Sequence, residues 1–356
     1  MKKRTIAGLL CVLSICLLFG VTTGCKQSGR KIAFFQYKKD DTFISEMMKY
    51  MTQKVDKDET FRGVTYVVCD AGNSQLVQNQ QILELISEGY DLFVVNAVDR
   101  LASNTIVEKC AREGIPVIFF NREPLKDALT PDNAGYKAYY VGADADSLGV
   151  EQAKMVAVLF TDRFAYSKFD KNNDGKVQLV ILKGEQGHQD AEKRTENCVS
   201  KLRELGYTVE VLGIELADWN RQDGYEAMKR FYKQYGDTIE LVFSNNDDMA
   251  VGAIDYLINE EVFFENKSIT EQPFVVVGVD GTAVGLKYIE KGLLYGTVKN
   301  DSVKQADDIL ALVDCILNGK DFDDFPEHPN MGSNEPYTIY IKGEIITLAN
   351  LKDYLN

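Results

Sequence analysis

The sequence predicts an α/β protein with two doubly wound lobes, each built on a parallel sheet. Nine short apolar runs, rich in Val, Ile and Phe, alternate with amphipathic stretches of helical length between residues 31 and 280. This alternation is typical of repeated strand–helix–strand units. One doubly wound domain rarely holds so many units, and 356 residues are enough for two full cores.

The expected strands are short runs bounded by polar residues or glycine. They cover residues 31–37, 64–70, 91–96, 115–120, 139–144, 177–182, 207–213, 239–245 and 273–280. In most of these runs polar and apolar residues do not alternate. We therefore expect strands that are buried on both faces, as in a parallel sheet. The stretches between them, such as residues 74–90 and 146–164, have the length and apolar spacing of helices that pack on a sheet.

The first 24 residues are typical of an export signal. Lys2, Lys3 and Arg4 precede an apolar run that is short for a membrane span. Residues 22–25, TTGC, resemble the lipobox of bacterial lipoproteins, with Thr22 in the place of the usual Leu. We therefore expect cleavage before Cys25, lipid attachment to Cys25 and a tether over residues 25–30. A plain cleaved signal without lipid is the alternative.

The charge of the chain argues against nucleic-acid binding. The formal net charge is −14, whereas binding to phosphate backbones needs a basic face.

Polar and aromatic residues follow most of the expected strands. Ligands of open parallel sheets bind beyond the carboxyl ends of the strands. The residues in these positions are Asp41, Phe43, Asn96, His188, Asp190, Arg194, Asn245, Asn246, Asp247, Asp248, Asp280 and Asn300. Together with Trp219, the only tryptophan, they favour a neutral polyhydroxylated ligand. Carboxylates and amides would bind its hydroxyls, and aromatic faces would pack on its C–H patches.

Each of these residues also has a purely local interpretation. Trp219 could belong to the core, and His188 could be a solvated loop residue. Asp190 could cap a helix or form a surface ion pair with Arg194 four residues later. Similar helix-capping roles are open to Asp247, Asp248, Asn300 and Asp301. Taken together, these roles would need the same coincidence at almost every strand end.

Within residues 169–178, FDKNNDGKVQ, the nine residues from Asp170 to Gln178 match the first nine positions of an EF-hand calcium loop. Asp170, Asn172, Asp174 and Gln178 have the spacing of its ligands, but the last position holds Ile181 instead of Glu. From these residues alone, an Asx-rich turn and a calcium site are about equally favoured.

The chain resembles the bacterial periplasmic galactose/glucose-binding proteins, the substrate-binding components of ABC sugar importers. The resemblance runs from about residue 31 to the C-terminus. It rests on nine stretches in order: YKKDDTF, NAVD, VIFFNREP, YYVGAD, FDKNNDGKVQ, LKGEQGHQDAEKR, NNDDMAVGA, VVVGVDG and GTVKND. It implies two Rossmann-like lobes joined by a three-stranded hinge. The expected lobes are residues 31–115 plus 300–338 and residues 116–299 plus 339–356, with crossings near 115, 299 and 339.

The resemblance also implies the ligands of a hexose and of a calcium ion. The hexose contacts would be Asp41, Phe43, Asn96, His188, Asp190, Arg194, Trp219, Asn246, Asp280 and Asn300. Phe43 and Trp219 would stack on opposite faces of the sugar ring. The calcium ligands would be Asp170, Asn172, Asp174, the carbonyl of Lys176, Gln178 and Glu240, which replaces the missing Glu. Gln189 stands where the family has Pro, which bears on the rigidity of that loop.

The function that follows is capture of D-galactose or D-glucose by a lipid-anchored monomer. Its partners would be an ABC permease with its ATPase, and a chemoreceptor is a further candidate. Receptors for another pyranose or a small polyol are the alternative of the same class. A sugar-responsive regulator would need a DNA-binding segment where the export signal stands. A sugar-acting enzyme would need two carboxylates flanking a scissile bond, and we expect no catalytic residues.

Overall fold

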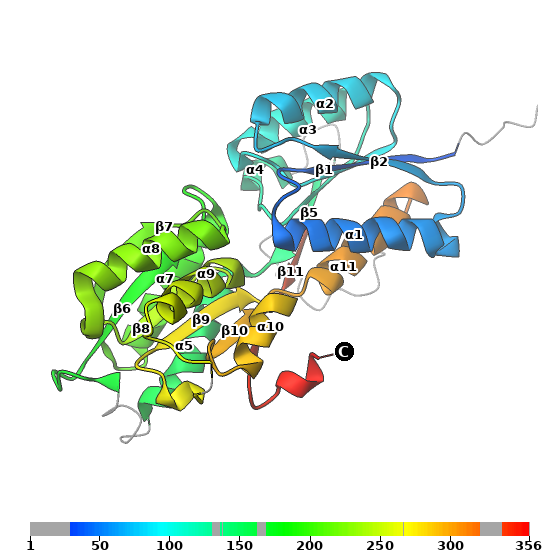
Figure 1. The fold of residues 1–356 in the computed structure, drawn as a ribbon. Coiled ribbons are helices and arrows are strands. Elements are labelled where there is room, and N and C mark those ends of the chain that lie inside the picture. The colour runs from blue at the N-terminus through cyan, green and yellow to red at the C-terminus, as the bar shows by residue number, and fades with distance from the viewer. Residues whose placement is uncertain are drawn as a thin grey trace, which may run out of the picture.

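The computed structural model describes residues 29–129, 136, 138–161, 169–265, 267–320 and 337–355. It consists of two α/β lobes, each with a six-stranded sheet and helices on both faces (Figure 1). This confirms the predicted fold class. The export signal, the lipid site Cys25 and most of the tether lie outside the described residues. No helix of the described part is long and apolar enough to span a membrane.

The secondary structure alternates between strands and helices along most of the chain. The strands are β1 (Lys31–Gln36), β2 (Thr65–Asp70), β3 (Leu92–Val95), β4 (Val117–Phe120), β5 (Ala138–Ala143), β6 (Lys176–Lys183), β7 (Thr208–Leu216), β8 (Leu241–Ser244), β9 (Val275–Asp280), β10 (Gly296–Lys299), β11 (Thr338–Ile341) and β12 (Glu344–Thr347). The helices are α1 (Thr42–Lys57), α2 (Gln75–Ser87), α3 (Ser103–Arg112), α4 (Lys126–Leu129), α5 (Ala145–Thr161), α7 (Gln189–Glu204), α8 (Arg221–Tyr235), α9 (Asp247–Asn259), α10 (Ala283–Glu290) and α11 (Ser302–Leu317).

The first lobe has the strand order β11-β5-β4-β3-β1-β2, with all its pairs parallel. Apolar side chains of α1 and α11 cover one face of this sheet. Those of α2 and α3 cover the other face. Because both faces are covered, the central strands are continuous apolar runs: β3 and β4 are buried at every residue.

The second lobe repeats this plan with the order β12-β10-β9-β8-β6-β7. Helices α8, α9 and α10 pack on one face and α5 and α7 on the other. Two features differ from the expectation. β12 is antiparallel to β10, and the outer strands β2 and β7 are only partly buried. An outer strand has a neighbour on one side only, so its apolar run does not guarantee full burial.

The chain passes between the lobes three times, but two crossings lie later than expected. β4 pairs with β3, β5 pairs with β4, and β11 pairs with β5, so all three belong to the first sheet. The first crossing therefore follows β5, near residue 144, instead of residue 115. The third lies between β11 and β12, near residue 342, instead of residue 339. The second, between β10 and α11, lies near the expected residue 299. Local sequence does not identify the sheet that a buried strand joins, and this explains the error.

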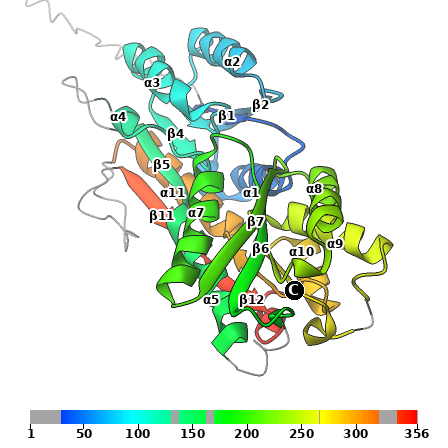
Figure 2. The same ribbon diagram turned by 90° about the vertical axis from the view of Figure 1, so that its left-hand side faces the viewer.

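Strands β5 and β11, which precede the first and third crossings, lie side by side in the first sheet (Figure 2). A Cβ atom at Gly343, in the third connection, would lie 2.4 Å from a methyl carbon of Leu148 and 2.6 Å from one of Val298. These two residues belong to helix α5, which follows the first crossing, and to strand β10, which precedes the second. The lack of a side chain at Gly343 is what allows the connections to lie this close.

Candidate ligand-binding cleft

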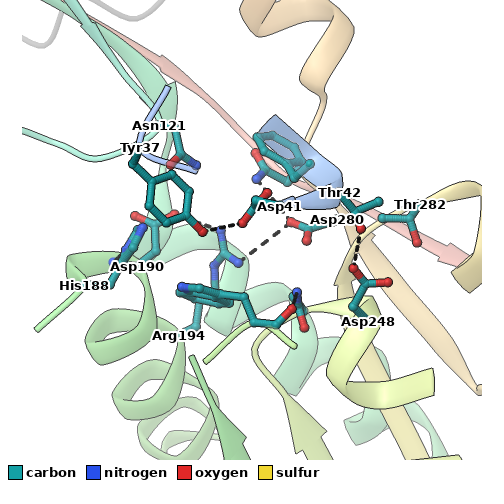
Figure 3. A pocket seen from close by; sticks show the side chains of 14 residues that line it. Tyr37, Asp41, Thr42, Asn121, His188, Asp190, Arg194, Asp248, Asp280 and Thr282 are labelled. Atoms are coloured by element: carbon teal, nitrogen blue, oxygen red, sulfur yellow. Dashed lines mark hydrogen bonds and ion pairs between the residues drawn. The ribbon is translucent and has the colours of Figure 1, made fainter. Parts of the chain in front are cut away.

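A polar cavity lies between the lobes, at the carboxyl ends of strands from both sheets (Figure 3). Its lining residues are Tyr37, Asp41, Thr42, Phe43, Asn121, His188, Asp190, Arg194, Trp219, Asn246, Asp248, Asp280, Thr282 and Asn300. Nine of the ten residues expected to contact the ligand are in this set. The structure thus brings together side chains that are more than 250 residues apart in the sequence.

Asp41 is held at the start of the first helix. It caps α1, because its Oδ1 accepts a hydrogen bond from the N–H of Ile44 at 2.9 Å. Its Oδ2 accepts one from the hydroxyl of Tyr37 at 2.6 Å. Both carboxylate oxygens of Asp41 are therefore fixed by groups of the first lobe, which orients the side chain toward the cavity.

Arg194 is the charged centre of the second-lobe side of the cavity. Its side chain is 3% exposed and forms an ion pair of 2.8 Å with Asp190, which is 2% exposed. This pair joins helix positions i and i+4, as one local interpretation suggested, but it is buried instead of lying on the surface. Among the described residues, neither Nε of Arg194 nor Oδ1 of Asp190 has a hydrogen-bond partner. Buried polar atoms normally have partners, so these two are candidates for contact with a ligand.

A second buried carboxylate shares the same guanidinium. Asp280 lies 3.8 Å from Nη1 of Arg194 and accepts a hydrogen bond from the amide of Asn300 at 3.3 Å. Burial raises the pKa of Asp280 well above its usual range, although Arg194 acts against this. Burial likewise raises the pKa of Asp190. Two carboxyl groups with one cation between them favour a neutral ligand whose hydroxyls donate hydrogen bonds.

Aromatic rings form another part of the wall. The rings of His188 and Trp219 meet edge to face at 5.1 Å, and the guanidinium of Arg194 lies 5.6 Å from the Trp219 ring. The indole fits closely against Gly184, where an added Cβ atom would lie 2.2 Å from it. Trp219 is thus held by packing at the cavity and is not a core residue away from the site. Phe43, from α1, is a buried lining residue of the first lobe.

His188 is a buried neutral base and not a solvated loop residue. It is the N-cap of α7, where its Nδ1 accepts from the N–H of Asp190 at 3.2 Å. Burial lowers its pKa well below the usual range, and the cations of Arg122, Arg194 and Arg100 act in the same direction. The neutral ring therefore carries its proton on Nε2.

Three lining residues that are not glycine adopt positive φ angles. They are Asn121 at 60°, Trp219 at 62° and Asp280 at 113°. This conformation is uncommon for residues with a side chain, and the strain is often found at functional sites. The concentration of such residues around one cavity supports its interpretation as the binding site.

Direct contacts between the lobes flank the cavity. Thr42 donates a hydrogen bond to Asp248 at 2.6 Å. Arg122 forms an ion pair of 2.5 Å with Glu185. In this closed arrangement the cavity measures about 30 Å³, which is room for about two water molecules. A hexose can enter only if the lobes separate or the lining side chains move.

Asn96 does not line the cavity, in contrast to its expected role. Its side chain is fully buried behind the wall. It accepts from the N–H of Tyr37 and donates to the carbonyl of Phe120 and to Oδ1 of Asn121. Asn96 thus positions two lining residues, Tyr37 and Asn121. A polar residue at a strand end can face the ligand or stand behind it, and sequence does not distinguish the two.

Five lining residues were not predicted as contacts: Tyr37, Thr42, Asn121, Asp248 and Thr282. Asp248 is among the residues that the strand-end rule selects, although the resemblance does not include it among the contacts. Tyr37 and Asn121 directly follow β1 and β4, so the same rule could have found them. The cap of α9 is Asn246, so Asp248 is not a helix cap. Thr42 and Thr282 have no signal in the sequence that separates them from ordinary residues at helix starts.

The expected calcium loop folds as a compact turn beside the start of β8. Oδ1 and Oδ2 of Asp170 accept from the N–H groups of Asp174 and Gly175 at 3.1 and 3.0 Å. Glu240 accepts from the N–H groups of Lys171 and Gln178 at 3.1 and 2.9 Å. Burial raises the pKa of Glu240 to about 7, and the nearby aspartates add to the shift.

This loop is not a preformed metal cage. In the described part of the chain, no group of three or more His, Cys, Asp or Glu side chains is spaced to hold a metal. The amide nitrogen of Asn172 instead lies 3.0 Å from Oε1 of Gln178. The donor set, all oxygen with three carboxylates, nevertheless fits a hard cation such as Ca²⁺. Binding would require the Asn172 amide to present its oxygen in place of the nitrogen that donates to Gln178 and Asp174.

The two α/β lobes enclose a polar cavity that has aromatic residues in its lining. This arrangement is typical of proteins that bind a small ligand between two lobes joined by a hinge. The chain belongs to the family of the periplasmic binding protein domain, whose model matches residues 32–321.

Two relatives and one solved structure are similar to this chain. It is 33% identical to the D-galactose/methyl-galactoside binding periplasmic protein MglB of Haemophilus influenzae. The similarity extends over 324 residues and covers 90% of each of the two chains. It is 24% identical to the ribose import binding protein RbsB of Bacillus subtilis, over 82% of this chain and 85% of that protein. An ABC transporter solute binding protein from Bacillus halodurans, with bound myo-inositol, has the same fold. Its TM-score is 0.73 at 24% identity, covering 92% of this chain and 97% of that one.

Proposed function

We propose that this protein captures a hexose, D-galactose or D-glucose, between its lobes and delivers it to the permease of an ABC importer. The observation that carries the proposal is the buried pair of Asp190 and Arg194. Each residue has one polar atom without a partner among the described residues, and both line the interlobe cavity. A sugar hydroxyl can donate to Oδ1 of Asp190 and accept from Nε of Arg194 at the same time.

The balance of charges supports a neutral ligand. Four carboxyl groups line the cavity, from Asp41, Asp190, Asp248 and Asp280, against the single guanidinium of Arg194. An anionic ligand would be repelled by this set. The rings of Phe43, Trp219 and Tyr37 offer apolar faces for the C–H patches of a pyranose.

The relatives support the sugar class more strongly than the choice of sugar. The relative from Haemophilus influenzae is named for D-galactose and methyl-galactoside, and the one from Bacillus subtilis for ribose. The solved structure of the same fold holds myo-inositol. The first is the most similar of the three, which favours a galactose-type hexose, and a polyol such as inositol is the second candidate.

Delivery would follow from opening and closing at the hinge. The contacts from Thr42 to Asp248 and from Arg122 to Glu185 close the cleft, and a permease would read the closed pair of lobes. Cys25 would hold the exported protein at the membrane through lipid. The loop at Asp170 and Glu240 would bind a structural Ca²⁺. A chemoreceptor is a further partner that would recognise the closed form.

The fluorescence of Trp219 tests the ligand directly, because it is the only tryptophan and lines the cavity. The protein is stripped of sugar by partial unfolding and titrated with galactose, glucose, ribose and myo-inositol. We expect a saturable change with galactose or glucose at concentrations at which ribose and inositol give none. The variant Asp190→Asn should bind the hexose at least tenfold more weakly. A response to inositol alone would replace the hexose by a polyol, and no response to any of the four would refute the sugar site.

A further inference from the structure

Asp247 is a buried carboxylate that follows a strand end but does not line the cavity. It is the first residue of α9 and is fully buried, and the N-cap of this helix is Asn246. Burial raises the pKa of Asp247 to about 7, although hydrogen bonds from two threonines act against this shift. The ionised side chain therefore destabilises the folded state above pH 7. A residue with this cost calls for a role other than holding the fold together.

Three hydrogen-bond donors converge on the carboxylate of Asp247. Its Oδ2 accepts from the N–H and from the hydroxyl of Thr282, at 2.8 and 3.1 Å. Its Oδ1 accepts from the hydroxyl of Thr297, in β10, at 2.7 Å. The oxygen of Thr297 in turn accepts from the N–H of Gly281 at 3.2 Å. Asp247 thus holds two consecutive N–H groups of the turn after β9, one directly and one through Thr297.

The backbone around this carboxylate lacks side chains at two positions. A Cβ atom at Gly278 would lie 2.2 Å from Oδ1 of Asp247, and one at Gly285 would lie 2.4 Å from Oδ2. These glycines belong to β9 and α10, on either side of the turn. Neither has a positive φ, so the backbone conformation does not explain the choice of glycine. The space that the carboxylate occupies does explain it.

The turn held by Asp247 begins at Asp280, whose carboxyl group lies beside Arg194 in the cavity (Figure 3). Asp280 has a φ of 113°. A residue with a side chain keeps such a conformation only where its surroundings hold it there. The two N–H groups that Asp247 holds belong to the next two residues of the chain, so these bonds act directly after the strained residue.

We propose that Asp247 is a positioning residue of the hexose site, which holds Asp280 in its strained conformation through Thr282 and Thr297. This inference rests on the proposed function, and Asp247 itself does not touch the ligand. Without these bonds the backbone of Asp280 would relax to a negative φ, and its carboxyl group would turn away from Arg194. Loss of the Asp247 carboxylate should therefore weaken hexose binding, although the residues that line the cavity are all retained.

The variants Asp247→Asn and Thr297→Val test the inference, because both keep the size of the side chain. The amide has one acceptor oxygen where the carboxylate has two, and valine leaves the N–H of Gly281 without this partner. Calorimetric titration with galactose and glucose at pH 8 measures affinity, and urea unfolding without sugar measures stability. Each variant should bind the hexose at least fivefold more weakly. Asp247→Asn should do so without a lower urea midpoint, since it removes a buried charge at this pH.

Crystal structures of the two variants show the positioning itself, independently of any sugar. Asp280 should have a negative φ in both, with its carboxyl group turned away from Arg194. The control is Thr52→Val on α1, which removes a hydroxyl that donates to carbonyls of its own helix at 2.9 and 3.1 Å. It should bind hexose as the unsubstituted protein does.

The inference is wrong if both variants bind hexose as the unsubstituted protein does, or if Asp280 keeps its φ near 113° in both. It is also wrong if the affinity of Asp247→Asn falls only in step with its urea midpoint. The proposed function stands in all these cases when the unsubstituted protein binds a hexose. If that protein binds none, the proposed function fails, and the crystal structures still decide whether Asp247 holds the turn.

Discussion

Replacing Asn96 with alanine is expected to destabilise the first lobe and to affect the ligand only indirectly. Its side chain is fully buried and makes three hydrogen bonds, of 3.3, 3.3 and 3.1 Å, to Tyr37, Phe120 and Asn121. A neutral hydrogen bond contributes about 1 kcal/mol, and a buried group left without a partner costs about 1–3 kcal/mol. Three broken bonds therefore predict a loss of roughly 3–5 kcal/mol in the free energy of unfolding. For a lobe of this size, that corresponds to a fall of roughly 10 °C in Tm.

The assay is urea unfolding of the sugar-free protein, followed by circular dichroism. The control is Asn79→Ala on α2, where the side chain is only partly buried and accepts one hydrogen bond from Gln75. The control should lose less than about 0.5 kcal/mol. A hexose titration of both variants completes the test. If Asn96→Ala unfolds as the unsubstituted protein does but binds hexose a hundredfold more weakly, Asn96 is a ligand contact and our interpretation of the structure is wrong.

Three further predictions concern other parts of the molecule. Saturating Ca²⁺, at a hundred times its Kd, should stabilise the protein by about 2.7 kcal/mol. Glu240→Gln should abolish this gain, and the exposed control Glu204→Gln on α7 should keep it, as measured by unfolding with Ca²⁺ and with chelator. Burial raises the pKa of Asp247 to about 7, so the folded state holds a proton that the unfolded state releases near pH 4. As the pH rises from 5 to 7, the contribution of Asp247 to the free energy of unfolding should fall by about 1.4 kcal/mol per pH unit. The variant Asp247→Asn should lack this pH dependence when unfolding is measured over the same range. Glu185→Gln removes the ion pair with Arg122 across the lobes and should speed hexose release two- to tenfold in stopped-flow experiments; an unchanged release rate would mean that the pair does not hold the cleft closed.

The existence of the strands could be predicted because buried strands are continuous apolar runs. Their membership in one sheet or the other could not. The crossing near residue 115 is what the resemblance implies, and the strand pairing places it near residue 144. β4 and β5 have the same local pattern as the strands of the second lobe, and only the pairing of β4 with β3 assigns them to the first. The short strand β12 was not anticipated either, because its neighbours along the chain give no helix–strand alternation.

The site was predictable to the extent that it follows strand ends. The rule that binding residues follow the carboxyl ends of strands selects nine residues that line the cavity, because these ends meet at one edge of a parallel sheet. It failed for Asn96, which has the same sequence context but stands one layer behind Tyr37 and Asn121. It also missed Thr42 and Thr282, whose place at the cavity depends on how the lobes and helix starts face each other. Whether a side chain lines the cavity or lies behind its lining, and which side chains meet between the lobes, depend on the tertiary structure. No local sequence pattern indicates either.

Strands β11 and β12 are the last strands to be synthesised, and this affects how the chain folds during synthesis. These two strands lie next to each other in sequence, yet one is the outer strand of the first sheet and the other of the second. Until residues 338–347 emerge from the ribosome, β5 and β10 are outer strands, and one edge of each lacks the partner that it has in the complete fold. Unpaired edges invite association with other chains. A premature stop before Tyr337 would therefore damage both halves at once, and neither half could be rescued as an independent fragment cut at a single point.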